Sequence, residues 1–348
     1  MARAIFMGSP DFAVPSLRAL VDAGHDVAAV VTQPDREAGR GRRLIPPAVK
    51  LAAQELGLPV LQPPSLRRPE AAAPLAALNP DLIVVAAFGQ ILRRHLLDLP
   101  PKGVLNVHAS LLPRWRGASP VTAAILAGDA ETGVSIMLLD EGLDTGPVLA
   151  TRATPIRDTD TGGSLTDRLA QIGADLLVET LPHWLDGSIA PQPQDDALAT
   201  YAPRLEKEAG RIDWSRPAVE LWRRVRAFTP WPGAYTLHGD VTLKLLEAWP
   251  LPGFAAAPPG TVVPLPWGAA DQVPPERPRP AFAVTTGDGF LLPLALQRAG
   301  KRPLFAEQFL RGERGFVGVR LGDMADSGPH PVRSAHASPS PNAGRGGA

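Results

Sequence analysis

Residues 104–117 read VLNVHASLLPRWRG, and this stretch decides the fold class of the chain. Its first five residues form a short, mostly apolar run that is typical of a buried β-strand, and the remainder is expected to be a loop. Because side chains alternate along a strand, Asn106 and His108 point to the same side. The stretch therefore predicts a strand that brings two polar side chains to one edge of a sheet.

The same kind of apolar run recurs before and after this strand. Further runs occupy residues 3–7, 26–32, 81–87 and 132–139. Helical patterns lie between them: Pro15 can open a helix with one apolar face, and residues 47–58 form another helix. Apolar strands that alternate with helices predict a Rossmann-like α/β domain, with a parallel sheet covered on both faces.

A third polar residue follows the next strand. Asp144 lies in the Gly-rich segment 140–147, directly after the run 132–139. Parallel sheets bind ligands at the carboxyl ends of their strands, so Asn106, His108 and Asp144 are candidate catalytic residues at one sheet edge. Each residue alone also has a structural interpretation, because polar residues cap strand ends and Asp is common in turns.

The composition and the motifs exclude several function classes. The 348 residues include no cysteine, so no thiolate nucleophile or Cys-ligated metal is possible, and one His with one Asp makes a weak zinc site. The turn after the first strand carries Pro10 and lacks the GxGxxG pattern. We therefore expect no metal and no nucleotide cofactor. Neither a secretory signal nor a membrane span of ~20 apolar residues is found, which predicts a soluble cytoplasmic protein.

A chain of this length fits two domains. We expect the catalytic α/β domain at residues 1–187, a Pro- and Gln-rich linker at 188–205, and a small OB-like β-barrel domain at 206–321. The barrel is predicted from a helix at 219–228 and from strands at 234–238, 241–248, 260–264, 282–286 and 290–296, with a long Pro-rich loop between 250 and 280. The tail, 322–348, has the composition of a disordered segment.

The charge distribution differs between the two halves of the chain. Residues 1–200 carry 17 basic and 22 acidic side chains, a net charge of −5, whereas residues 201–321 carry 16 and 11, a net charge of +5. A basic second half on a neutral protein favours a polyanionic partner such as a nucleic acid. A charge of this size also fits ordinary surface variation, so charge alone leaves both interpretations open.

These motifs resemble those of the folate-dependent formyltransferases. The resemblance to the family is carried by NVHASLLPRWRGASP and GDAETGVSIMLLDEGLDTGPVL. It is extended over residues 3–320 by GSPDFAVPSL, TQPDREAGRGRRLIPPAVKLAA, TYAPRLEKEAGRIDW and RAFTPWPGAY. The Arg-rich string is similar to that of the members that formylate methionyl initiator tRNA.

The resemblance implies an activity and its partners. The family transfers the formyl group of 10-formyltetrahydrofolate to an amine, without a metal. The expected partners are a folate and initiator methionyl-tRNA, and we expect a monomer without membrane contact. The resemblance also implies that Asn106, His108 and Asp144 are catalytic. A loop that contacts tetrahydrofolate is implied at Ser110, Leu111, Leu112 and Pro113.

A mechanism can be built on these positions. The nucleophile would be an α-amino group, whose pKa near ~8 leaves a neutral fraction at physiological pH, so no ATP is needed. Asn106 could donate an N–H to the oxyanion of the tetrahedral adduct, and a protonated His108 could donate a stronger bond. Asp144 could either favour the charged imidazole or accept the proton of the amine, and the sequence leaves both roles open.

Two groups of basic residues are predicted to bind the tRNA. The first lies in the segment 33–50 at the same sheet edge, and the resemblance implies that it enters the acceptor stem: Arg36, Arg40, Arg42 and Arg43. The second is expected to bind the phosphate backbone from the barrel domain: Arg223, Arg224, Arg226, Lys244, Arg298, Lys301 and Arg302. Taken alone, the first segment also reads as a solvated loop. Trp222 and Trp231 could stack on bases, but both are interpreted as core or packing residues.

Two other functions fit parts of the sequence. A formyltransferase that acts on a sugar-nucleotide or another small amine would need Asn106, His108 and Asp144 but not the basic segments. A non-catalytic RNA-binding protein would need the basic segments but not the three polar residues. Activity with a charged tRNA separates these possibilities.

Overall fold

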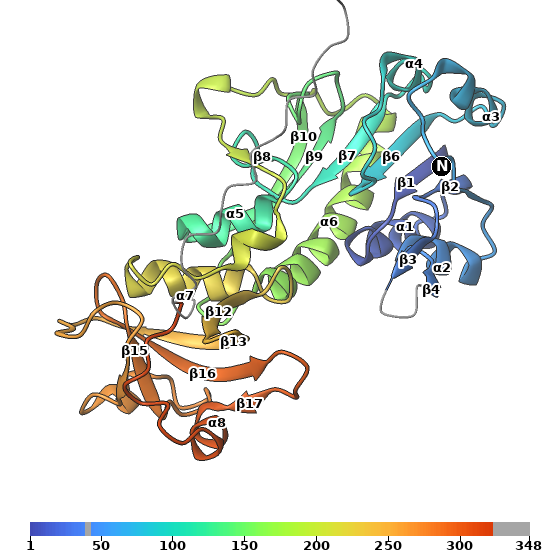
Figure 1. Ribbon diagram of the computed structural model, residues 1–348. Coiled ribbons are helices and arrows are strands. Elements are labelled where there is room, and N and C mark those ends of the chain that lie inside the picture. Colours follow the sequence, from blue (N-terminus) through green and yellow to red (C-terminus); the bar gives the residue numbers. More distant parts are fainter. Residues whose placement is uncertain (39–42, 323–348) are drawn as a thin grey trace, which may run out of the picture.

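The structure, a computed structural model, describes residues 1–38 and 43–322. An α/β domain is followed along the chain by a domain built around an antiparallel sheet, and helices meet between the two (Figure 1). Arg40 and Arg42, and the predicted disordered tail after residue 322, lie outside the described residues.

A seven-stranded sheet forms the first domain, with the order β10-β9-β7-β6-β1-β2-β5. Its strands are β1 Arg3–Gly8, β2 Asp26–Val31, β5 Val60–Leu61, β6 Leu82–Ala86, β7 Val104–His108, β9 Glu131–Leu138 and β10 Val148–Pro155. The predicted parallel pairing is confirmed from β5 to β7. β9 and β10 depart from it, because β9 is antiparallel to both of its neighbours. The connection 139–147 is too short for the crossover that a parallel pair needs, so β9 and β10 form a hairpin.

Helices cover both faces of this sheet. They are α1 Val14–Asp22, α2 Ala48–Glu55, α3 Ala73–Ala76, α4 Arg94–Leu97, α5 Pro120–Ala127 and α6 Gly162–Leu185. Alternate residues of β1 enter different cores, with Phe6 packed on one face and Ile5 and Met7 on the other. The 24-residue α6 begins with a capping box between Thr161 and Ser164 and packs against α1 and the sheet. α6 also contacts β7 and β9, and it helps to hold these two strands in place.

The second domain is an OB-like antiparallel half-barrel, with the strand order β12-β13-β16-β15-β14 and β17 beside β16. Its strands are β12 Ala234–His238, β13 Val241–Leu251, β14 Val262–Pro264, β15 Phe282–Thr285, β16 Phe290–Arg298 and β17 Leu304–Phe305. Its helices are α7 Ala218–Ala227 and α8 Ala306–Gly312. The predicted helix and the five predicted strands are each confirmed within a few residues.

Two segments that were expected to be loops contain short strands. In the Arg-rich segment, β3 Arg36–Ala38 pairs with β4 Arg43–Ile45 in an antiparallel ribbon. In the predicted linker, β11 Tyr201–Ala202 pairs in parallel with β8 Arg116–Gly117 of the catalytic domain. The linker therefore packs against the loop that follows β7. No helix in the described part of the chain is both long and apolar enough to cross a membrane.

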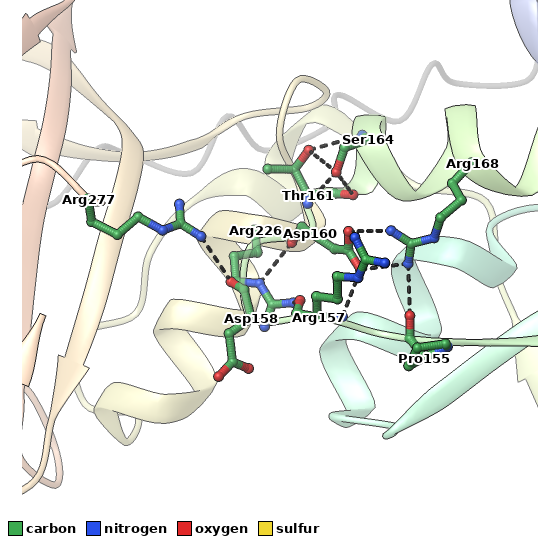
Figure 2. A network of polar contacts seen from close by, with 9 residues as sticks. All are labelled: Pro155, Arg157, Asp158, Asp160, Thr161, Ser164, Arg168, Arg226 and Arg277. Atoms are coloured by element: carbon green, nitrogen blue, oxygen red, sulfur yellow. Dashed lines mark hydrogen bonds and ion pairs between the residues drawn. The ribbon is translucent and has the colours of Figure 1, made fainter. Parts of the chain in front are cut away.

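A polar network joins the two domains beside the start of α6 (Figure 2). The carboxylate of Asp160 accepts two hydrogen bonds of 2.7 Å from the guanidinium of Arg168. Arg226 of α7 donates to the backbone carbonyl of Asp160 at 2.8 Å and also to the carbonyl of Arg157. Arg277, from the Pro-rich loop of the half-barrel, donates to the backbone carbonyl of Asp158 at 3.4 Å, and it also ion-pairs with Glu247 of its own domain at 2.6 Å. The connection between β10 and α6 is thus held from both domains.

Candidate functional site

The three residues singled out at the sheet edge lie together. Asn106 and His108 lie at the end of β7, and both are buried. Asp144 lies in the connection between β9 and β10, and its Oδ2 atom is 3.8 Å from Nδ1 of His108. All three line one cleft. The structure therefore places the predicted catalytic residues around a common space.

The ring of His108 has a defined orientation. Its Nε2 atom lies 3.0 Å from the backbone carbonyl oxygen of Trp115. Because a carbonyl oxygen only accepts hydrogen bonds, Nε2 carries a proton and donates it. Nδ1 is then the ring nitrogen that can gain or lose a proton, and it faces Asp144. The 3.8 Å gap between Nδ1 and the carboxylate is too long for a direct hydrogen bond.

The carboxylate of Asp144 is held by the backbone. Its Oδ2 atom accepts a hydrogen bond of 2.8 Å from the N–H of Gly117. Gly117 has a φ of +111°, and a Cβ atom there would lie 2.6 Å from the carbonyl oxygen of Ala202. Only glycine permits this approach of the chain, so the donor to Asp144 depends on the residue type at position 117. Asp144 itself has a φ of +53°, a left-handed conformation that Asp tolerates better than most residues.

The amide of Asn106 is available to a ligand. Among residues 1–38 and 43–322 no hydrogen-bond partner is found for this side chain, although only 8% of its surface is exposed. Its amide atoms are not among the buried unpaired atoms of the described residues, which indicates that they open onto the cleft. Since Asn106 lines the cleft, a bound molecule can supply the missing partner.

The cleft lies between the two domains and has a volume of about 770 Å³. Apolar side chains of the catalytic domain line one part of it, including Phe12, Phe88 and Leu139. The half-barrel domain contributes Pro230 and Trp231 to the lining. A space of this size and lining suits a ligand with a flat apolar ring system and a few polar groups.

The two tryptophans differ from each other in their environment. Trp222 is 8% exposed and packs in the core of the half-barrel, as predicted. Trp231 is 57% exposed and faces the cleft, so its interpretation as a packing residue is wrong. It follows α7 in the chain and belongs to a segment whose Thr229 carbonyl accepts a hydrogen bond of 2.9 Å from the N–H of Gly163. The start of α6 therefore helps to place Trp231.

The loop predicted to contact tetrahydrofolate does not line this cleft. Its members are Ser110, Leu111, Leu112 and Pro113. Ser110 is fully buried and donates to the carbonyl of Arg114 at 2.6 Å, and the N–H of Leu112 donates to Ser135 at 3.1 Å. These bonds shape the loop that presents the Trp115 carbonyl to His108. A direct contact of these four residues with folate stays a prediction.

Some of the predicted tRNA-binding residues are exposed, and others are bonded to other parts of the protein. Lys301 and Arg302 are exposed in the turn between β16 and β17, and Arg36 is exposed on β3. Arg43 belongs to β4. In contrast, Arg224 donates to the carbonyl of Ala209 at 2.8 Å, and Arg226 is engaged at the domain junction. Their guanidinium groups make contacts within the protein, and phosphate binding by these two residues stays a prediction.

Two residues near Asp144 were not predicted as site residues. Gln194, from the predicted linker, bonds to the backbone of Asp144, and Arg116 bonds to Gln194. The partners are 50 and 78 residues apart, so no local spacing could reveal them. Within the described residues, no group of three or more His, Asp or Glu side chains is placed to hold a metal.

Comparison with known proteins relates both domains to one family. A family model described as "Formyl transferase" matches residues 2–181, and one described as "Formyl transferase, C-terminal domain" matches residues 204–314. A methionyl-tRNA formyltransferase of Roseiflexus sp. (strain RS-1) is 50% identical over 325 residues, which cover 93% of this chain and 96% of the relative. One of Pseudomonas paraeruginosa (strain PA7) is 49% identical over 319 residues, which cover 89% and 98%.

A solved structure shares the fold. An N-formyltransferase from Helicobacter canadensis, in complex with folinic acid and dTDP-3-aminofucose, superposes with a TM-score of 0.60 at 19% identity. The match covers 87% of this chain and 100% of that chain. At 19% identity, this likeness shows the fold alone. The two relatives at about 50% identity match both the catalytic and the half-barrel domains.

Proposed function

This chain belongs to the formyl transferase family, and from that membership we propose that it transfers the formyl group of 10-formyltetrahydrofolate to the amino group of methionine on initiator tRNA. The observation that carries the proposal is the close similarity to methionyl-tRNA formyltransferases along nearly the whole chain, half-barrel domain included. A formyltransferase that acts on a small sugar amine is less well supported, since the relatives at high identity carry the name of the tRNA enzyme.

The proposed reaction uses the three residues at the sheet edge. The α-amino nitrogen attacks the formyl carbon, and the carbonyl oxygen becomes an oxyanion that the amide of Asn106 can stabilise by donating an N–H. The attacking nitrogen loses a proton to Asp144 or to Nδ1 of His108. The adduct then collapses, the bond from carbon to N10 of the folate breaks, and N10 takes up a proton. The products are formylated methionyl-tRNA and tetrahydrofolate.

The proposed folate site is the apolar part of the cleft. Its lining by Phe88 and Leu139, together with Asn106, supports a folate bound with the formyl group on its N10 atom toward the three polar residues. Asn106, His108 and Asp144 supply proton donors and acceptors, so these residues can carry the chemistry without a metal. We place the enzyme in the cytoplasm, because its acceptor belongs to translation.

The function is tested by following the release of tetrahydrofolate from 10-formyltetrahydrofolate. The purified protein is supplied with methionine-charged initiator tRNA, with the same tRNA uncharged, or with a small sugar amine. Turnover with the charged tRNA alone is expected, because only that molecule carries the free α-amino group. Turnover with the sugar amine alone would replace the proposal by the small-amine alternative.

Reversing the charge of Lys301 and Arg302 is expected to weaken tRNA binding. Both side chains are exposed in the turn between β16 and β17. If each side chain contacts a phosphate, about two fewer counterions are released when the double Glu variant binds the tRNA. The slope of the logarithm of the binding constant against the logarithm of the salt concentration then becomes shallower by about 2. Filter binding at several salt concentrations measures this slope. The same double reversal at Arg67 and Arg68, an exposed pair on the catalytic domain, serves as control. An unchanged slope in the Lys301/Arg302 variant would exclude this contact.

Replacing Trp231 with Ala is expected to raise the KM for charged tRNA about tenfold, since stacking on an aromatic ring contributes ~1–3 kcal/mol per base. Trp231 is exposed in the cleft opposite the catalytic domain, where it can meet the end of the acceptor. Trp267 is a second exposed tryptophan of the half-barrel domain and does not line the cleft, so Trp267→Ala is the matched control. Equal kinetics for the two variants would remove Trp231 from acceptor binding.

A further inference from the structure

A chain of hydrogen bonds connects the segment between the domains to the loop that carries Asp144. The side-chain amide of Gln194 donates to the backbone carbonyl of Asp144 at 2.8 Å and to the carbonyl of Gly146 at 2.6 Å. One amide thus holds two carbonyls of the connection between β9 and β10. Gln194 is partly buried and comes from the segment that sequence composition marks as a linker.

The other end of the Gln194 side chain is fixed by a buried arginine. Its Oε1 atom accepts a hydrogen bond of 3.0 Å from Nε of Arg116, and the guanidinium of Arg116 also pairs with Asp196 at 2.7 Å. Arg116 is 1% exposed, whereas the carboxylate of Asp196 is 83% exposed. A guanidinium buried to this degree is costly unless its donors are paired. Gln194 and Asp196 accept these hydrogen bonds from Arg116. The bond from Arg116 also sets the orientation of the Gln194 side-chain amide.

The same short strand holds Asp144 from a second direction. β8 contains Arg116 and Gly117, and the N–H of Gly117 donates to the Asp144 carboxylate. The side chain of Asp144 is therefore held by the backbone of β8. The backbone of Asp144 is held by the side chain of Gln194, which Arg116 of β8 orients. Because Asp144 adopts a left-handed φ of +53°, these outside bonds help to maintain a backbone shape that is otherwise unfavourable.

We propose that Gln194 is a positioning residue for the reaction: it acts through the backbone of Asp144 and Gly146, and Arg116 acts through Gln194. The inference rests on the proposed function, because it assigns Gln194 a role in placing the carboxylate that handles the proton of the amine. It also gives the segment between the domains a part in the chemistry, since Gln194 and Tyr201 both attach that segment to β8.

The first test compares two glutamines of the same segment. Gln194→Leu removes both N–H donors and the acceptor oxygen of the side-chain amide. It is expected to lower the single-turnover rate of formyl transfer about 10- to 100-fold, since misplacing a catalytic group by about 1 Å lowers a rate by a factor on that order. The dissociation constants for folate and charged tRNA should change by less than about twofold. Gln192→Leu is the control, because the amide of Gln192 is exposed and bonds only to the nearby Ala190 carbonyl among the described residues. Equal rates for the two variants would overturn the proposal.

A second variant separates hydrogen-bond donation from packing. Gln194→Glu keeps the size of the side chain and an acceptor for Arg116, but its carboxylate has no N–H for the carbonyls of Asp144 and Gly146. It is expected to lose as much activity as Gln194→Leu. Wild-type activity in this variant would contradict the proposal. Should Gln194→Leu fail to fold, as judged by its melting temperature, this variant decides the question.

A double-mutant cycle tests whether Gln194 acts through Asp144. In an Asp144→Asn background, Gln194→Leu should cause no further loss of rate, whereas a general structural defect would add its own loss. Additive losses would overturn the proposal. A crystal structure of Gln194→Leu gives a readout that is independent of activity: the 2.8 Å bond between Gly117 and Asp144 should lengthen or break. If the wild-type protein shows no turnover with charged tRNA, the proposed function fails, while this structural comparison still decides the role of Gln194.

Discussion

Asp144→Asn is expected to lower the rate of formyl transfer about 10³-fold while binding of folate and charged tRNA is retained. The substitution keeps the size of the side chain and an oxygen that can accept the hydrogen bond from Gly117. The loop should therefore keep its shape. What is lost is the negative charge near His108 and the ability to take up a proton, and such groups contribute about 10²- to 10⁴-fold to rates.

The measurement is single-turnover kinetics together with separate binding assays for each substrate. Asp167→Asn is a matched control, because Asp167 is an exposed carboxylate that lines the same cleft and, among the described residues, makes no contact with His108. The control should keep its rate within about threefold. Turnover near the wild-type rate in Asp144→Asn would remove this residue from the chemistry, and with it the basis of the Gln194 proposal.

The same variant can separate the two roles that the sequence left open for Asp144. If the carboxylate acts by holding His108 in its charged form, then the double variant should lose little more rate than either His108→Gln or Asp144→Asn alone. If the carboxylate accepts the proton of the amine and His108 stabilises the oxyanion, the two losses should multiply. The 3.8 Å distance between Nδ1 and Oδ2 is compatible with both arrangements, since the two groups are within ion-pair range but do not share a direct hydrogen bond.

The sequence predicted the central parts of the fold because they rest on local patterns. The apolar runs of β1, β2, β6 and β7 and the helix α7 lie where their periodicity placed them. β10 was not predicted. Along most of its length its residues alternate between half-buried and exposed at the edge of the sheet, so it lacks the continuous apolar run that marked the inner strands. Edge strands of this kind leave a weaker signal than buried ones.

The sequence predicted only those residues of the site that lie at or shortly after the end of a strand. Asn106 and His108 were assigned to one side of β7 by alternation, and the structure places both in the cleft. Gln194 could not be found, because its contact with Asp144 joins residues 50 positions apart and its own neighbourhood reads as a linker. Trp231 was misassigned for a related reason: a tryptophan is more often buried than exposed in a cleft, and only the packing of the two domains shows which applies.

Asp160→Asn is expected to cost about 3–5 kcal/mol of the free energy of unfolding, because it breaks a buried ion pair and leaves the charge of Arg168 uncompensated. Asp160 is 4% exposed, and its carboxylate accepts bonds of 2.7 Å from Arg168 and from the backbone N–H of Arg157. Figure 2 shows these partners around the connection between β10 and α6. Urea unfolding at neutral pH measures the loss. Asp158→Asn is the control, since Asp158 is exposed two positions away, and it should change stability by less than about 0.5 kcal/mol.

The pH dependence of this loss has a defined sign. Burial alone would raise the pKa of Asp160, but the hydrogen bonds from Arg168 and Arg157 outweigh burial and hold the pKa below its ordinary value. A carboxyl with a lowered pKa in the folded state stabilises the protein fully above its unfolded pKa of ~3.9, and this contribution disappears as the pH falls through the folded pKa. The difference between the wild-type protein and Asp160→Asn should therefore be constant from about pH 7 to 5 and shrink below about pH 4. A difference that stays constant through that acid range would show that the ion pair with Arg168 does not stabilise the junction.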